Sequence, residues 1–276
     1  MIVTQLPTPT RRPLRRLPRQ LQPDAIRLSY FAAMRNVLGR ARQLVEERLV
    51  PALPELVAAA AMVHDAVRIT NYASKVTEVI GKLAGDFFGE FTNKRLADMA
   101  AGFGARTSTL QRQQISRQFA DSLGIDIAVA EPELMPRIEA WAAQNASLIK
   151  SVPTKYLSEI EASTIDALRT GTRAEDIAAD YVDRYGVSEG RAKLIARDQI
   201  GKLNAQVNQA RQENLGVTQF RWAGSNDERE CDECSPYEGK TYAWDDPPSG
   251  GLPGEIHPGC RCQGEPILSD IYEALR

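Results

Sequence analysis

An apolar pattern of helical period runs almost without interruption from Pro23 to Gly216, and it is the feature that most constrains this fold. At its start Ile26, Tyr30 and Met34 recur every four residues, which places them on one face of a helix. Proline and glycine punctuate such a pattern. They predict helix ends or breaks at Pro51, at the two glycines near residue 103, at Pro153, at Gly171 and at Gly186. The sequence therefore predicts a body of several separate helices.

The period changes after Gly216. The segments "VTQFRWAG" and "GKTYAWDD" alternate between apolar and polar residues and are rich in aromatic side chains, which is typical of short strands. The Pro- and Gly-rich segment "DDPPSGGLPGE" that follows predicts a loop. We expect a mainly α fold, in which a long helical body carries a small C-terminal β-rich, zinc-binding module in an α+β arrangement.

All four cysteines of the chain lie in this last part, together with one of its two histidines. The motif "CDEC" separates two cysteines by two residues, and "HPGC" separates a histidine and a cysteine in the same way. Proline followed by glycine favours a type II turn, which brings the first and fourth residues together. Two such pairs joined by a loop are typical of a structural zinc site. The candidate ligands are Cys231, Cys234, His257, Cys260 and Cys262.

These five candidates compete for the four positions of one tetrahedral zinc ion. In "CRC", residues Cys260 and Cys262 face the same way if the segment is extended, so either could bind. Few apolar residues lie between Trp222 and Pro266, and a bound zinc ion can contribute on the order of 10 kcal/mol to folding such a module. We therefore expect one structural zinc per chain, with one candidate left over.

Three other roles for the cysteines remain open. A redox CxxC pair usually opens a helix after a strand, which the flanking "DERE" and "SPYEG" do not resemble. A disulfide would require an oxidising compartment. A catalytic zinc would need a neighbouring base in a recognised pattern such as HExxH, and none occurs. The second histidine, His64, has no histidine or cysteine near it in sequence, so we interpret it as a packing or surface residue.

The N-terminus carries a cluster of positive charge in a chain whose net charge is −2. The segment "RRPLRRLPRQ" contains two prolines and no acidic residue, which predicts a basic flexible arm over residues 1–22. Such an arm could remain solvated or could bind an acidic protein or nucleic acid. Its candidate contact residues are Arg11, Arg12, Arg15, Arg16 and Arg19.

The sequence also indicates a compartment. It begins without the apolar segment of a secretory signal, and its most apolar run, "LVAAAAMV", is far shorter than the roughly 20 residues of a membrane span. We expect no membrane contact and a protein that folds in a reducing cytoplasm.

A longer stretch resembles a known family. The helix "LIARDQIGKLNAQVNQARQENLG", a strand bearing Trp222, "CDEC" and the closing "IHPGCRC" are similar to the phage Mu F-like head morphogenesis proteins, also called minor head or minor capsid proteins. The resemblance covers about residues 140–268. It implies structural roles for Arg197, Asn204 and Trp222, of which the first two would link the long helix to the zinc module. In "ARDQ" the chain has Gln199 where the family often carries glutamate, which removes one possible ion pair.

The resemblance implies a division of the chain and a function. We expect a helical N-terminal domain over residues 23–150, the Mu F-like domain over 151–268 with its zinc module at 217–268, and a C-terminal tail over 269–276. The implied protein is not an enzyme. It would act in procapsid assembly at the portal vertex, in the host cytoplasm, would remain in the head of the virion and would aid DNA packaging or ejection. Its partners would be the portal protein, the major capsid or scaffold protein and, through the arm, packaged DNA.

Two alternatives belong to other classes. A zinc-ribbon DNA-binding protein would need a basic module, yet the segment from Arg221 to Cys262 carries more acidic than basic residues. A zinc-dependent enzyme would need a base in a motif, as stated above.

Overall fold

The computed structural model describes residues 6–14, 16–61, 66–127, 134–224 and 232–276, with the backbone alone over 66–71. The chain forms two compact units. Unit 1 comprises Met1–Leu28, Ala101–Ala142 and Arg197–Arg276, and unit 2 comprises Ser29–Ala100 and Ala143–Ala196. Long helices run from one unit into the other, so neither unit is a continuous stretch of sequence. The domain boundaries expected from the sequence remain a prediction.

Unit 2 is built from helices. It contains most of α1 (Asp24–Arg48), the short η2 (Val50–Ala52), α2 (Leu53–Ala61), α3 (Ala66–Glu90) and parts of α4 (Asn93–Leu123), α5 (Leu134–Thr170) and α6 (Ala174–Asn214). The helices pack through large apolar side chains that are fully buried, including Tyr30, Leu38, Val76, Phe87 and Tyr156. Polar contacts join neighbouring helices at the edges, as between Thr77 of α3 and Glu161 of α5, 2.7 Å apart.

Three expected helix breaks do not occur. Helix α4 continues through the glycines near residue 103, α5 continues through Pro153, and α6 continues through Gly186. Each correction has the same physical reason: burial of the helix face outweighs the local preference to end. A helical proline costs about 3 kcal/mol, yet Pro153 is followed in α5 by the buried Tyr156 and Leu157.

The helix ends predicted at Pro51 and Gly171 are confirmed. Pro51 lies in η2, directly after α1. Gly171 adopts φ +75°, and the amides of Gly171 and Thr172 donate to the carbonyls of Leu168 and Ala167. This is the Schellman arrangement, in which a left-handed residue lets the chain turn back onto the last carbonyls of the helix.

Unit 1 has an aliphatic core at the place where α4 and α6 end. Phe119 and Leu123 of α4 pack there with Leu215 and Val217, which follow α6. The C-terminal helix α7 (Ser269–Ala274) contributes Ile271 to the same core. Residues expected to be a C-terminal tail are thus a short helix with a buried side chain.

The described residues of the N-terminal arm, 6–14 and 16–22, follow a defined path through unit 1, whereas the sequence predicted a flexible arm. Leu6 and Leu17 pack on the aliphatic core, and the amides of Thr10 and Arg11 donate to the carbonyl of Leu123. Gln20 is buried, where its Nε2 donates to Gln118 and Asn208 at 3.1 Å each. The apolar and amide residues between the arginines account for the difference, because they find partners on α4 and α6.

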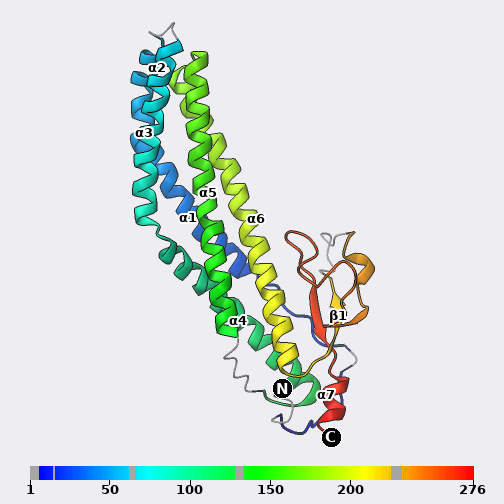
Figure 1. The fold of residues 1–276 in the computed structure, drawn as a ribbon. Coiled ribbons are helices and arrows are strands. Elements are labelled where there is room, and N and C mark those ends of the chain that lie inside the picture. The colour runs from blue at the N-terminus through cyan, green and yellow to red at the C-terminus, as the bar shows by residue number, and fades with distance from the viewer. Residues whose placement is uncertain (1–5, 15, 62–65, 128–133, 225–231) are drawn as a thin grey trace. The chain divides into compact units, whose positions relative to one another are not determined.

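The C-terminal module contains, within the described residues, an antiparallel sheet of three strands in the order β2-β1-β3. Strands β1 (Gln219–Ala223) and β2 (Thr241–Ala243) lie where the alternating pattern predicted strands. Strand β3 (Gln263–Pro266) was not expected, because "QGEP" has no alternating pattern. In Figure 1, β1 and β3 lie beside the C-terminal part of α6, within unit 1.

Candidate metal centre

Three of the expected ligands meet in one place. The ligand atoms of Cys234, His257 and Cys260 all lie within 4.8 Å of one another. The Sγ of Cys234 is 3.5 Å from Nε2 of His257 and 3.8 Å from Sγ of Cys260. Around a tetrahedral ion with Zn–S bonds of about 2.3 Å and a Zn–N bond of about 2.0 Å, ligand atoms are about 3.5–3.8 Å apart. The three atoms therefore fit a single zinc-sized ion.

Local turns place these atoms. Cys234 precedes the short 3-10 helix η3 (Ser235–Tyr237), and its carbonyl accepts from the amide of Tyr237. In "HPGC" the amide of Cys260 donates to the carbonyl of His257 at 3.1 Å, and Gly259 has φ +73°. This is the type II turn predicted from the sequence, since only glycine readily adopts that conformation at the third position.

The histidine ring has the orientation that metal binding by Nε2 requires. Nδ1 of His257 lies 3.1 Å from the carbonyl oxygen of Pro258. A carbonyl can only accept, so this contact favours the tautomer with the proton on Nδ1, in which Nε2 presents its lone pair toward Cys234. A hydrogen bond from the second ring nitrogen to a carbonyl is the usual support of a metal-bound histidine.

Cys262 lies beside the three ligand atoms. Its side chain is buried and contacts Cys260 and Cys234. The thiol of Cys262 donates to Cys260, and this lowers the pKa of Cys260 despite its burial, with help from the amides of Cys262 and Gly254. The same contact with Cys260, together with burial, raises the pKa of Cys262. The lowered pKa favours the thiolate form of Cys260, which is the form that binds metal.

The fourth position has two candidates. Cys262 is adjacent to the cluster, and Cys231 lies outside the described residues, as does His64. The described cysteines, Cys234, Cys260 and Cys262, are free thiols.

An aromatic core supports the centre, although the sequence suggested that the module could bury little. Trp222 is fully buried, and the rings of Phe220 and Trp244 stack with centroids 4.0 Å apart. Cys234, Cys260 and Cys262 belong to the same buried cluster. The metal site is therefore one side of a small hydrophobic core.

Helix α6 holds the module through small and polar residues. The close approach of Gly254 to Ala205 would leave only 2.5 Å between their Cβ atoms if Gly254 had one. Asn208 and Gln212 both donate to the carbonyl of Gly264, at 2.9 and 2.6 Å, which covers the outer edge of β3. Gln206 donates to Glu255 at 2.8 Å.

The two helix residues that the resemblance singled out have different contacts. Arg197 donates to the carbonyl of Gly259 at 3.3 Å, next to Cys260. Asn204 is buried and accepts from Gln111 at 2.8 Å, so this contact joins α6 to α4. The supporting residues Asp198, Ala205, Asn208 and Gln212 were not singled out from the sequence. The sequence does contain a pattern that could have indicated them: they recur at helical spacing as a stripe of small and polar residues beside the apolar stripe.

The described arginines of the arm, Arg11, Arg12, Arg16 and Arg19, are exposed. Arg19 donates to the carbonyl of Gly224 at 2.6 Å and lies 3.9 Å from the carboxylate of Glu238. The side chains of Arg11, Arg12 and Arg16 are solvent-exposed, and Arg15 lies outside the described residues.

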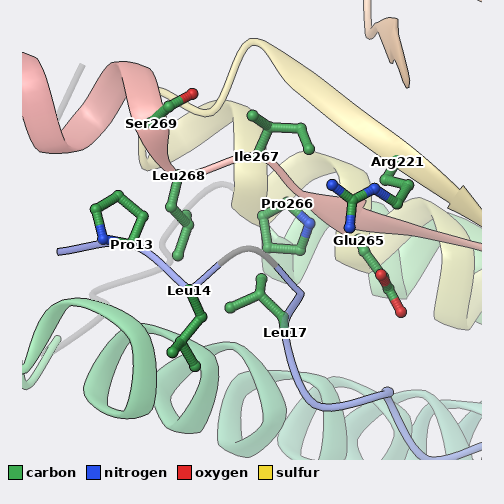
Figure 2. Close-up of a pocket in the computed structure, with 9 residues that line it drawn as sticks. All are labelled: Pro13, Leu14, Leu17, Arg221, Glu265, Pro266, Ile267, Leu268 and Ser269. Carbon is green, nitrogen blue, oxygen red and sulfur yellow. The ribbon is translucent and has the colours of Figure 1, made fainter. Parts of the chain in front are cut away.

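A cavity of about 330 Å³ lies between the arm and strand β3, and no candidate metal ligand lines it. Figure 2 shows Leu17 of the arm beside Pro266, Leu14 pointing away from Leu268, and Arg221 and Glu265 together at one side. Burial raises the pKa of Glu265, and the nearby Arg221 opposes this effect. In the described part of the chain, no helix is long and apolar enough to cross a membrane.

A family model and a curated relative are similar to parts of the chain. Residues 158–264 match the family model described as phage Mu protein F like protein. An uncharacterized protein of Haemophilus influenzae is 32% identical over 186 residues, which cover 65% of this chain and 41% of the relative's length. No solved structure matches. The family expected from the sequence is therefore confirmed as the one that residues 158–264 resemble: this segment is similar to the phage Mu F-like proteins.

Proposed function

We propose that this chain is a structural protein of a phage head, which acts in procapsid assembly at the portal vertex and stays in the virion. The observation that carries the proposal is the family match over residues 158–264. This segment contains the end of α5, all of α6 and most of the module, including the cysteine cluster. Its partners would be the portal protein and the major capsid or scaffold protein.

The contacts of the module support a structural role. Cys234 and Cys260 are buried, His257 is half-buried, and the residues packed around the cysteines are mostly aromatic. A structural zinc site has this closed character, whereas a catalytic site keeps an open position. We therefore propose that the chain is not an enzyme and that one zinc per chain stabilises the module.

The zinc proposal names its ligands. Cys234, His257 and Cys260 would each supply one atom, and either Cys231 or Cys262 would supply the fourth. When bound, the ion would cross-link the segment after β1 to the segment before β3. Metal analysis of the purified chain should give one zinc per chain. A module that is equally stable with and without the metal would contradict the proposal.

The assembly proposal is tested on particles. Procapsids and mature particles are purified from cells that produce the phage, and the chain is quantified by mass spectrometry relative to the portal protein. The proposal expects a few copies in both particles and co-purification with the portal. Absence from both particles would refute it.

A DNA contact through the arm is a second part of the proposal. The exposed guanidinium groups of Arg11, Arg12 and Arg16 support it, because arginine contacts phosphate well. Binding of the full chain to duplex DNA should weaken steeply as salt rises. Affinity that is unchanged between low and high salt would exclude the contact.

A further inference from the structure

The turn that carries two of the metal ligands is held by two neighbouring residues of α6, Arg197 and Asp198. The carboxylate Oδ1 of Asp198 accepts from the amide of Gly259 at 2.9 Å. Arg197 donates to the carbonyl of the same Gly259 at 3.3 Å. Gly259 lies between His257 and Cys260, so both peptide groups at the centre of the turn are fixed from the helix.

Asp198 is itself held in place. Its second oxygen, Oδ2, accepts from Lys202 at 2.9 Å and from Gln199 at 3.0 Å. The side chain is 16% exposed. Because both oxygens are engaged, the carboxylate is a support for the turn and not a further ligand.

The backbone of the turn lies directly on the helix surface. A Cβ on Gly201 would lie 3.3 Å from the carbonyl oxygen of Cys260, and a Cβ on Gly259 would lie 3.0 Å from Nε of Arg197. Glycine at both positions allows this approach. The turn therefore cannot shift along α6 without breaking these contacts.

We propose that Asp198 is a positioning residue for the metal centre, which fixes the His257–Cys260 turn so that both ligand atoms are in place before the ion binds. This inference rests on the zinc centre proposed above. A ligand turn that is already ordered loses less conformational entropy on metal binding, which raises the affinity. Groups that orient ligands in this way typically change metal affinity by about 10- to 100-fold.

The experiment uses the full chain with Asp198→Asn and Asp198→Ala. The Asn variant keeps an oxygen that can accept from Gly259 but loses the charge that binds Lys202, so it should lose less affinity than the Ala variant. The matched control is Asp180→Asn, because Asp180 also lies on α6 and pairs with a basic residue four positions later, Arg184, at 2.5 Å. Zinc affinity is measured by competition with a chromophoric chelator, and cobalt(II) absorption reports the ligand set.

We expect affinity to fall by about 10- to 100-fold for Asp198→Ala, less for Asp198→Asn and not at all for the control. The cobalt spectrum should keep its four-coordinate bands, because no ligand has been removed. Thermal unfolding of the metal-free variants separates this effect from a loss of folding. Affinity within threefold of the parent for both variants would overturn the role of Asp198 alone. If the parent chain binds neither zinc nor cobalt, the metal centre itself is refuted, and this role falls with it.

Discussion

Substitution of Gly254 by alanine tests how closely the metal-binding loop lies on α6. Gly254 has φ +89°, a conformation that residues with a Cβ rarely adopt. Its added Cβ would lie 2.5 Å from the Cβ of Ala205 and 3.4 Å from the carbonyl oxygen of Cys262. The first distance is far inside van der Waals contact, so either the loop or the helix must move.

Two separate terms set the magnitude. Placing alanine at a positive φ costs about 1–2 kcal/mol. Overpacking against a buried neighbour costs a further 1–3 kcal/mol or so. The module should therefore lose roughly 2–5 kcal/mol, and both terms act on the segment that leads to Cys260.

Two further variants separate these terms. Gly251→Ala is the matched control, since Gly251 has φ +109° but nothing within 4 Å of its added Cβ, so only the backbone term applies. Ala205→Gly removes the collision partner and costs about 1 kcal/mol itself as a helical glycine. In the double variant with Gly254→Ala, the cost of overpacking should disappear, because the Cβ of Ala205 is no longer present. The two substitutions should therefore show a coupling energy of about 1–3 kcal/mol.

Hydrogen exchange measured by mass spectrometry is the suitable assay, because it reports local opening of the module rather than unfolding of the whole chain. The amides of Trp222 and Trp244 donate to the carbonyls of Lys240 and Thr218, so peptides that contain them report on the sheet. A loss of 2 kcal/mol speeds exchange by about 30-fold. If the effects of Ala205→Gly and Gly254→Ala simply add, the loop does not lie on α6 as described.

Three other changes test separate contacts. Gln212→Leu removes one of the two donors to the carbonyl of Gly264, so thermal unfolding should show a loss of about 1–2 kcal/mol in stability. The control Gln209→Leu, on the exposed side of α6, should have little effect. Equal losses of stability would contradict the role of Gln212 at the edge of β3. Burial raises the pKa of Glu265 in the folded protein, so the ionised carboxylate destabilises the fold at neutral pH. This cost disappears as the pH falls and the carboxyl is protonated. Glu265→Gln should therefore stabilise the protein at neutral pH by an amount that disappears below about pH 4, and a stabilisation in urea unfolding that grows toward acid would have the wrong sign. Cys234→Ser and Cys260→Ser should each disturb the cobalt(II) spectrum. Only one of Cys231→Ser and Cys262→Ser should do so, because only one of these cysteines can be the fourth ligand. If neither Cys231→Ser nor Cys262→Ser disturbs the spectrum, the fourth ligand is not a cysteine.

Features that depend only on neighbouring residues could be predicted from the sequence. The helical period from Pro23 to Gly216 predicted a mainly α body, and the change of period predicted strands β1 and β2. Proline followed by glycine in "HPGC" predicted the type II turn, because turn geometry depends only on four consecutive residues. The structure has each of these elements in the expected place. Cys234, His257 and Cys260 were among the ligand candidates for the same reason.

Features that depend on distant partners could be seen only in the folded chain. Gly104 does not end α4, because it allows close packing against Ile138 of α5, whose Cγ2 would be 2.7 Å from an added Cβ. The arm has a defined path because Gln20 finds amide partners on α4 and α6, and β3 forms because Asn208 and Gln212 cover its outer edge. Local propensities are worth about 1 kcal/mol per residue, whereas burial of one large side chain is worth about 2–3 kcal/mol. Where the two compete, long-range packing decides the fold, and a single sequence does not reveal which distant residues will meet.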